Sequence, residues 1–125
     1  MVEQSVVTAV QNYLTEVSKR FPVTFGALYG SQTTGKSNYW SDIDLIVVSK
    51  KFDRDYTYDD EADLWRIAGR TDIRIEPIAC GEKRWQNEQV SPIILIAKRE
   101  GQIIYPQVHE PYELPKPTEP YKLLK

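Results

Sequence analysis

A glycine-serine turn and a pair of aspartates lie ten residues apart and together could handle a phosphorylated substrate. Gly30 and Ser31 end an apolar segment, and Asp42 and Asp44 lie at the start of a predicted strand over residues 43–48. Side chains two residues apart on a strand share one face, so both carboxylates can contact the same hard cation. The glycine lets the backbone approach a phosphate closely, and the serine adds a hydroxyl and an N–H. The spacing predicts a triphosphate-binding turn beside a metal-binding pair.

Two neighbouring carboxylates repel each other, which indicates what the pair binds. Without a counter-charge, the repulsion raises a pKa and destabilises the ionised pair. A divalent cation such as Mg²⁺ removes this cost. The alternative is that Asp42 only caps a turn and Asp44 only ends a solvent-facing strand. The pairing with the Gly-Ser turn and the buried strand that follows favours a functional site.

The same segment formally matches a second phosphate-binding pattern. Gly30, Gly35, Lys36 and Ser37 have the spacing of a P-loop. A P-loop opens into a helix whose N-terminus holds the phosphates, but only residues 38–41 separate this motif from Asp42. The acidic residues also open the next strand, whereas a P-loop protein needs its carboxylate at a strand end. We therefore reject the P-loop interpretation.

Composition limits the classes of protein to consider. The 125 residues (14.5 kDa) suffice for one domain with a core, and 16 basic against 18 acidic residues disfavour long nucleic acid as a partner. The lone Cys80 excludes an intramolecular disulfide framework and is compatible with a reducing cytoplasm. No run approaches the roughly 18 apolar residues of a membrane span, and residues 1–5 do not resemble a signal peptide. We expect a cytoplasmic protein without membrane contact.

The elements that must position these residues follow from hydrophobic periodicity and from turn residues. The pattern predicts helices over 6–21, 61–69 and 93–99, and strands over 23–29, 43–48, 71–79 and 102–105. Gly69 is expected to stop the second helix, and Ser91-Pro92 to begin the third. This order predicts an α/β or α+β domain with a small mixed sheet flanked by helices. We assign residues 1–105 to this domain and 106–125, with five of the eight prolines, to an extended C-terminal tail.

The third predicted strand contributes polar residues of its own. In the segment 71–79, Asp72, Arg74 and Glu76 alternate with apolar residues, and Pro77 is expected to close the strand or nearly so. One interpretation is a solvated strand face with an ion pair. The other interpretation is that this face of the strand borders the predicted phosphate- and metal-binding site.

At these residues the sequence resembles the nucleotidyltransferase superfamily that includes polymerase β and kanamycin nucleotidyltransferase, and within it the minimal nucleotidyltransferase (MNT) domains. The resemblance is strongest over residues 23–76. It implies that Gly30 and Ser31 contact the nucleoside triphosphate, and that Asp42 and Asp44 bind two Mg²⁺ ions together with a third carboxylate from a neighbouring strand. Glu76 is our preferred third carboxylate.

Asp72 is the runner-up for that role. One departure from the family concerns the phosphates: Thr34 stands where many members have an arginine before the glycine that Gly35 resembles. Lys36 and Arg74 are the cations that could contact phosphate instead, or triphosphate handling is weakened.

The resemblance implies in-line attack of an acceptor hydroxyl on the α-phosphorus of a nucleoside triphosphate, with transfer of AMP from ATP as our preferred reaction. MNT proteins of this size resemble the antitoxin halves of two-gene toxin–antitoxin modules, whose partner is a HEPN-type RNase that some of them modify with AMP. We expect such a protein partner for this adenylyltransferase. The alternatives are a non-catalytic module that neutralises its partner by occlusion, and a homo-oligomeric transferase for a small molecule.

Overall fold

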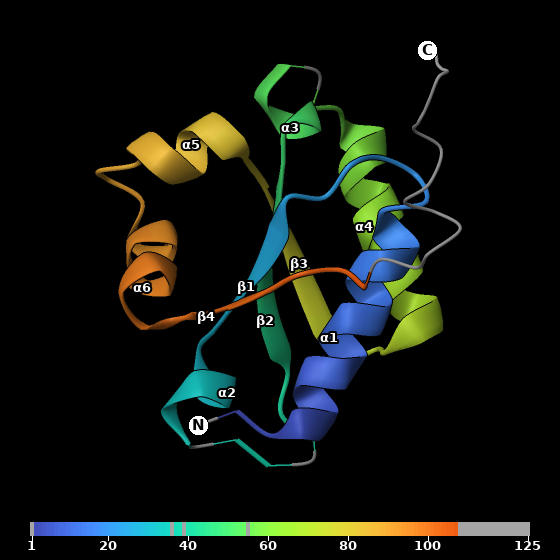
Figure 1. Ribbon diagram of the computed structural model, residues 1–125, viewed down its shortest axis with the longest axis vertical. Helices are drawn as coiled ribbons and strands as arrows, with labels where there is room; N and C mark the ends of the chain where they lie inside the picture. Colours follow the sequence, from blue (N-terminus) through green and yellow to red (C-terminus); the bar gives the residue numbers. More distant parts are fainter. Residues whose placement is uncertain (1, 36, 39, 55, 108–125) are drawn as a thin grey trace, which may run out of the picture.

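The computed structural model describes residues 2–35, 37–38, 40–54 and 56–107, in which a four-stranded sheet lies between two groups of helices (Figure 1). The helices are α1 Gln4–Val17, α2 Ser31–Thr34, α3 Lys51–Arg54, α4 Tyr58–Thr71, α5 Glu82–Asn87 and α6 Pro92–Glu100, and the strands are β1 Phe25–Tyr29, β2 Ile43–Ser49, β3 Ile75–Gly81 and β4 Gln102–Ile104. The expected mixed α+β fold is confirmed.

The sheet has the order β3-β2-β1-β4. β1 is antiparallel to both β2 and β4, whereas β2 and β3 are parallel. Parallel strands need a crossover connection, and here α3 and α4 form it. Helices α1 and α4 cover one face of the sheet, and α5 and α6 lie on the other (Figure 1).

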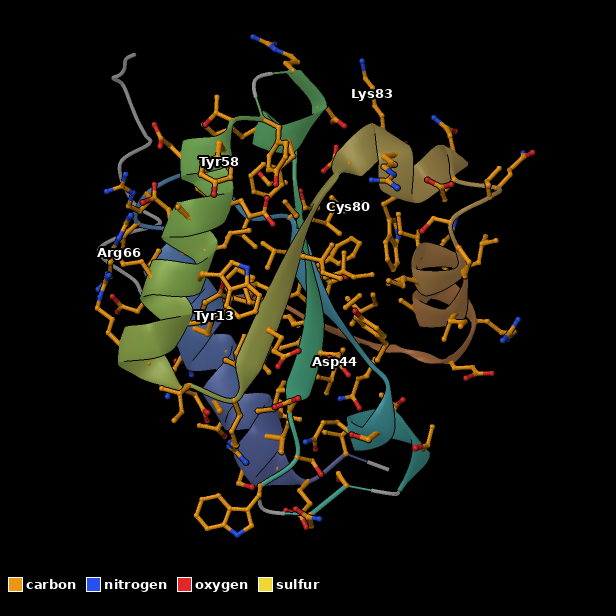
Figure 2. The ribbon with its side chains drawn as sticks, turned by 180° about the vertical axis from the view of Figure 1, so that it is seen from behind. Tyr13, Asp44, Tyr58, Arg66, Cys80 and Lys83 are labelled. Carbon is orange, nitrogen blue, oxygen red and sulfur yellow. The ribbon has the colours of Figure 1, made fainter. Side chains whose placement is uncertain are left out.

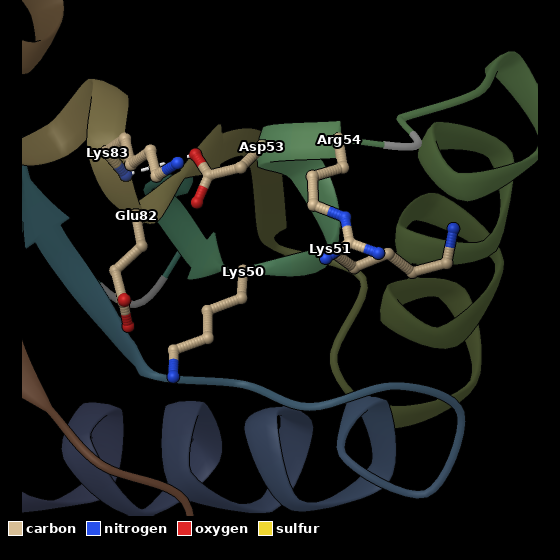
Figure 3. Close-up of a pocket in the computed structure, with 6 residues that line it drawn as sticks. All are labelled: Lys50, Lys51, Asp53, Arg54, Glu82 and Lys83. Carbon is tan, nitrogen blue, oxygen red and sulfur yellow. Dashed lines mark hydrogen bonds between the residues drawn. The ribbon is translucent and has the colours of Figure 1, made fainter.

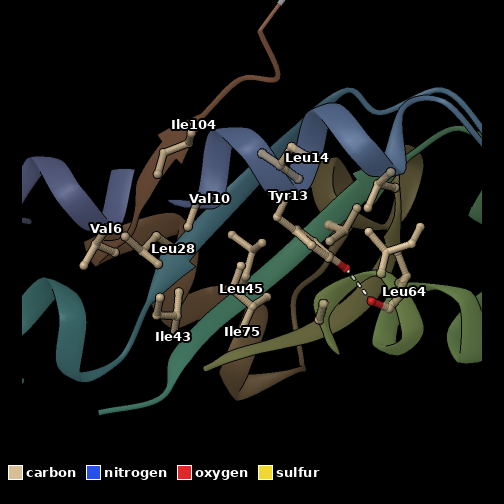
Figure 4. Close-up of a cluster of buried hydrophobic side chains, with 14 of the residues drawn as sticks. Val6, Val10, Tyr13, Leu14, Leu28, Ile43, Leu45, Leu64, Ile75 and Ile104 are labelled. Atoms are coloured by element: carbon tan, nitrogen blue, oxygen red, sulfur yellow. Dashed lines mark hydrogen bonds between the residues drawn. The ribbon is translucent and has the colours of Figure 1, made fainter. Parts of the chain in front are cut away.

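Strand β2 is buried on both faces, as expected for a central strand. Leu45 and Val47 join the cluster formed with α1 and α4, while Ile46 and Val48 join the smaller cluster formed with α6. In the larger cluster the fully buried Tyr13 donates its hydroxyl to Leu64 O at 2.9 Å, which ties α1 to α4 (Figure 4). The start of β2 is therefore held by packing from both sides.

Helix α4 is longer than its sequence pattern predicts. It begins with a capping box: the N–H of Asp60 donates to the Thr57 side chain, and the N–H of Thr57 donates to the Asp60 side chain. The prediction that Gly69 stops the helix is wrong: Gly69 does not adopt the positive φ of a helix-ending glycine, and α4 continues to Thr71.

The prediction of a strand over 71–79 is also wrong in its bounds. Thr71 is helical, Asp72 caps the end of α4, and β3 runs from Ile75 to Gly81. Pro77 lies inside β3, paired with Leu45, and does not close it. A proline is tolerated there because β3 is an edge strand of the sheet.

The end of the domain agrees with its sequence pattern. Ser91 Oγ accepts from Ile94 N, Pro92 is the first helical residue of α6, and Gly101 caps its end. The short helices α2, α3 and α5 were not expected. No helix in the described ranges is long and apolar enough to cross a membrane.

Apart from Pro106 and Gln107, the predicted tail 106–125 lies outside the described residues, and its boundary with the domain stays a prediction.

The turn between α5 and α6 depends on one carboxylate. Glu88 accepts hydrogen bonds from Arg84 Nε at 2.9 Å, Val90 N at 3.1 Å and Ser91 N at 2.7 Å. The bond from Arg84 is the largest cause that lowers the pKa of Glu88 from 4.5 to about 2, followed by the two backbone bonds.

We predict that this carboxylate stabilises the fold only when ionised. Because its folded pKa lies below its ordinary value, its contribution is complete above pH 4.5 and disappears as the pH falls to about 2. Urea unfolding of the wild type and of Glu88→Gln should differ most near neutral pH and converge in acid. A difference that is constant over this range would contradict the role assigned to Glu88.

Candidate active site

Strand register brings three distant segments to one end of the sheet. Tyr29, the last residue of β1, pairs with Asp44 in antiparallel β2, and Asp44 pairs with Glu76 in parallel β3. Gly30 and Ser31 directly follow Tyr29. The predicted phosphate turn, aspartate pair and third carboxylate therefore meet where β2 begins, and Figure 2 shows Asp44 at that end.

The three carboxylates also share a face of the sheet. Side chains alternate along a strand, so Asp44 faces the same side as Ile46, which packs in the cluster against α6. Glu76, its cross-strand partner, faces that side too. Asp42 is exposed, while Asp44 and Glu76 are half-buried. Asp42 and Asp44 both contribute to the raised pKa of Glu76, which places all three groups in one cluster.

Negative charge accumulates in this cluster. Burial is the main cause that raises the pKa of Asp44, with the charge of Asp42 as the second. The pKa of Glu76 is raised by burial, by the charge of Asp42 and its hydrogen bond, and by the charge of Asp44. In the described ranges no lysine or arginine forms an ion pair with any of the three.

The negative charge of Asp44 and Glu76 also affects the neighbouring phenol of Tyr29. Burial, followed by the charges of Asp44 and Glu76, raises the pKa of Tyr29 to about 12. Tyr29 therefore keeps its proton at neutral pH and can only be a neutral neighbour of the carboxylates. We did not expect it from the sequence, in which it appears as one more apolar strand residue.

The donor set fits a hard divalent cation. Carboxylate oxygens are the ligands that Mg²⁺ prefers, and a cation would cancel the repulsion that adds to burial in raising the pKa of Asp44 and Glu76. Among the described residues, no three His, Cys, Asp or Glu side chains already converge at metal-binding distances. A bound cation would draw these carboxylates closer together.

The turn before α2 requires glycine for two reasons. Gly30 has φ of 79° and ψ of −147°, which side chains rarely allow. A Cβ at this position would lie 2.6 Å from Asp44 Oδ2, so only glycine lets the turn approach this carboxylate. Gly30 O accepts from both Thr33 N at 3.0 Å and Thr33 Oγ1 at 2.9 Å, which fixes the turn. Ser31 begins α2 directly beside it.

A buried amide that the sequence did not single out holds the aspartate loop in place. Gln32 is 4% exposed, and its Nε2 donates to Ser41 O at 3.4 Å and to Asp42 O at 3.2 Å. These bonds join α2 to the backbone that carries Asp42. A glutamine within a polar loop has no sequence signal of this role, because its partners are main-chain carbonyls nine and ten residues away.

Asp72 and Arg74 form a pair with each other beside the cluster. Asp72 accepts from Arg74 N at 2.9 Å, Nε at 3.0 Å and Nη2 at 2.8 Å, and the bond from the guanidinium is the largest cause that lowers the pKa of Asp72. The expected strand face of Asp72, Arg74 and Glu76 does not form, because the strand begins only at Ile75. The structure brings Glu76, and not Asp72, next to Asp44.

The sequence proposed Lys36 and Arg74 as cations that contact phosphate, and the structure describes the position of Arg74 only. Arg74 lines a cavity of about 220 Å³ with Gln32, Ser37, Asn38 and residues at the start of α1, and its carbonyl accepts from Ile43 N at 2.8 Å. Lys36 lies outside the described residues. Thr34, which stands at the place of the family arginine, is exposed and bonds only locally, to Ser31 O at 3.4 Å.

Comparison with known families agrees with this geometry. The nucleotidyltransferase domain family matches residues 10–74, which are 65 of the 125 residues. The chain belongs to the nucleotidyltransferase domain family. The match includes Gly30, Ser31, Asp42 and Asp44, and it ends two residues before Glu76. The superfamily expected from the sequence is thereby confirmed.

A solved structure supports the nucleotidyltransferase fold. The crystal structure of a candidate nucleotidyltransferase from Sulfolobus solfataricus superposes with a TM-score of 0.51, at 20% identity, over 66% of this chain and 72% of that one. Comparison with curated protein sequences gives no match. At this identity the likeness concerns the fold alone.

We predict that Gly30 tolerates alanine poorly because of Asp44. Gly30→Ala should destabilise the protein by about 1–3 kcal/mol, through both backbone strain and contact with the carboxylate. Gly35→Ala is the control, since Gly35 has the same φ of 79° but no neighbour within 4 Å, and should cost about 1 kcal/mol.

Chemical unfolding of both variants, and of Gly30→Ala in an Asp44→Ala background, separates the two causes. The Asp44→Ala background should recover part of the loss at Gly30. An equal loss with and without the Asp44 side chain would contradict the assigned contact.

Proposed function

We propose that this protein is a Mg²⁺- and ATP-dependent nucleotidyltransferase that moves AMP to an acceptor hydroxyl. The observation behind the proposal is the cluster of Asp42, Asp44 and Glu76 beside the Gly30 turn, in a chain of the nucleotidyltransferase domain family. Uncompensated carboxylates next to a glycine-serine turn are suited to bind a metal–triphosphate complex.

The chain's residues would divide the work as follows. Gly30 and Ser31 would contact the triphosphate, because the missing side chain at Gly30 leaves the backbone accessible. Asp42 and Asp44 would hold two Mg²⁺ ions, and Glu76 would complete the ligand set and position the acceptor hydroxyl. When bound, the ions would stabilise charge on the phosphates and make the acceptor oxygen more nucleophilic.

The reaction is a substitution at phosphorus. The acceptor oxygen bonds to the α-phosphorus while the bond from that phosphorus to the pyrophosphate oxygen breaks. Pyrophosphate leaves, and the acceptor proton passes to a nearby carboxylate or to water. Lys36 and Arg74 are the candidates for additional phosphate contacts, and Arg74 would first have to release part of its pairing with Asp72.

We further propose that the acceptor is a partner protein in the cytoplasm, of the HEPN toxin type, and that the protein acts as its antitoxin. The support is the resemblance of the Gly-Ser, ten-residue, Asp-x-Asp spacing to that of MNT antitoxins. A small-molecule acceptor bound between copies of this chain is the alternative for the same chemistry.

A non-catalytic role in occluding the partner is favoured by one observation. Thr34 places a neutral, exposed side chain where many family members have an arginine. If no other cation compensates, triphosphate binding weakens and the carboxylate cluster becomes a remnant of an active ancestor.

The first test is transfer of label from α-labelled ATP, with the other nucleotides in parallel, to protein in the presence of Mg²⁺ and the co-purifying partner. We expect a discrete labelled protein, and at least about a 100-fold loss of label with Asp42→Asn plus Asp44→Asn, because the metal ligands are removed. Asp59→Asn, an exposed change in the first turn of α4, is the control. Labelling that survives the double variant would contradict the proposed site, whereas equal partner binding without transfer would support occlusion.

A second test distinguishes the two candidates for the third carboxylate. Glu76→Gln should lower the transfer rate about 100-fold with little loss of stability, since Glu76 has no cationic partner in the described ranges. Asp72→Asn should instead lower stability, by about 1 kcal/mol, because it weakens the bonds with Arg74. Steady-state rates and urea unfolding of both variants provide the comparison. The opposite pattern would assign the third carboxylate to Asp72.

A further inference from the structure

A second polar pocket lies at the end of the sheet opposite the carboxylates. β2 and β3 are parallel, so their last residues, Ser49 and Gly81, lie at the same end. Lys50 lies six positions after Asp44, which corresponds to about 20 Å along a strand. The pocket has a volume of about 440 Å³ and is lined by Lys50, Lys51, Asp53, Arg54, Glu82 and Lys83 (Figure 3). This volume is typical of small-molecule sites.

Both acidic residues of the pocket are engaged in structural contacts. Glu82 Oε2 accepts from Thr24 Oγ1 at 2.7 Å, and Asp53 Oδ1 accepts from the backbone N–H of Lys83 at 3.0 Å. Within the described ranges neither carboxylate forms an ion pair with a base of the pocket. Both carboxylates line the pocket and offset part of its positive charge.

The basic residues of the pocket are unequally paired. Lys51 donates to Asp60 Oδ2 at 2.8 Å and is largely neutralised by it. Lys50, Arg54 and Lys83 are exposed and form no ion pair within the part of the chain that the structure describes. Three cations without an ion-pair partner in the described ranges therefore line the pocket together with the two carboxylates, which leaves its lining with an excess of positive charge.

The pocket has a fixed frame. Ser49 Oγ donates to Pro22 O at 2.6 Å and accepts from Lys51 N at 3.1 Å, so the exit of β2 is held in place. At the exit of β3, a Cβ at Gly81 would overlap the Asp53 carboxylate, so glycine permits the close approach of α3 to α5. The basic residues of the pocket therefore lie on two segments, after β2 and after β3, whose backbones are held in place by these contacts.

We propose that this pocket binds a small oligophosphate anion, such as pyrophosphate or the phosphates of a nucleotide. An arginine offers a planar pair of N–H donors to phosphate oxygens, and lysines add point charges. The anionic carboxylate cluster repels such a ligand unless cations are present, whereas this pocket attracts it directly. The site is distinct from the proposed active site and does not depend on its activity.

Backbone amide NMR of the full chain tests the proposal. Pyrophosphate and, separately, ATP are titrated in EDTA, so that no divalent cation assists binding at the carboxylates. We expect shifts concentrated in residues 49–54 and 81–84 with both ligands, and weakening of binding as salt is raised. Shifts that appear with ATP but not with pyrophosphate would overturn the proposal, because phosphate would then not be the ligand.

Charge-matched variants complete the test. Lys50→Ala plus Arg54→Ala should weaken pyrophosphate binding about tenfold, since two of the three cations are lost. Lys98→Ala plus Arg99→Ala, which removes the same charges from the exposed end of α6, should leave it unchanged. Asp42→Asn plus Asp44→Asn should also leave it unchanged. An equal loss in the α6 control would show attraction by net charge alone and would overturn the site.

Discussion

Repulsion among the carboxyl groups of Asp42, Asp44 and Glu76 is the constraint that the rest of the structure must withstand. Burial and then this repulsion raise the pKa of both Asp44 and Glu76, and within the described ranges no basic side chain forms an ion pair with the cluster. The packing of β2 counters it. Leu45 and Ile46 are fully buried on opposite faces of the sheet, and each buried side chain of this size contributes about 1.5–3 kcal/mol.

Strand direction then decides which groups meet. β1 antiparallel to β2 places the Gly30 turn at the start of β2, and β3 parallel to β2 places Glu76 there as well. The opposite end of the same two strands presents Lys50 and Lys83. The three carboxylates of the cluster and the cations of the pocket thus lie at opposite ends of one sheet, although the net charge of the chain is only −2. Such separation lets one small domain attract cations at one end and anions at the other.

Local sequence signals predicted much of this arrangement. The buried strand at 43–48, the Ser91-Pro92 helix start and the Gly-Ser turn each depend on residues next to one another, and the structure contains all three. Alternation of polar and apolar residues predicted a strand from 71 onward, but Gly69 keeps a helical backbone and α4 runs on to Thr71. The true face of β3 begins only at Ile75.

Other features had no local signal because they depend on distant partners. Gln32 is recognisable only once its bonds to Ser41 O and Asp42 O are seen. The charged pocket likewise requires residues 50–54 and 82–83 to be brought together by parallel pairing of β2 and β3. The family match supports the chemistry of the carboxylate end, whereas the acceptor depends on the proposals above.

The most direct measurement for the central claim, that the carboxylate cluster binds a divalent cation, is thermal unfolding of the wild type and of Asp44→Asn, each in EDTA and in Mg²⁺. A ligand that binds only the folded state raises Tm, so Mg²⁺ should raise Tm of the wild type. In EDTA, Asp44→Asn should be at least as stable as the wild type, because one repelling charge is gone, and Mg²⁺ should no longer stabilise it. A wild-type Tm that does not change on addition of Mg²⁺ would contradict the account, as would a Mg²⁺-dependent rise in Tm that persists in Asp44→Asn.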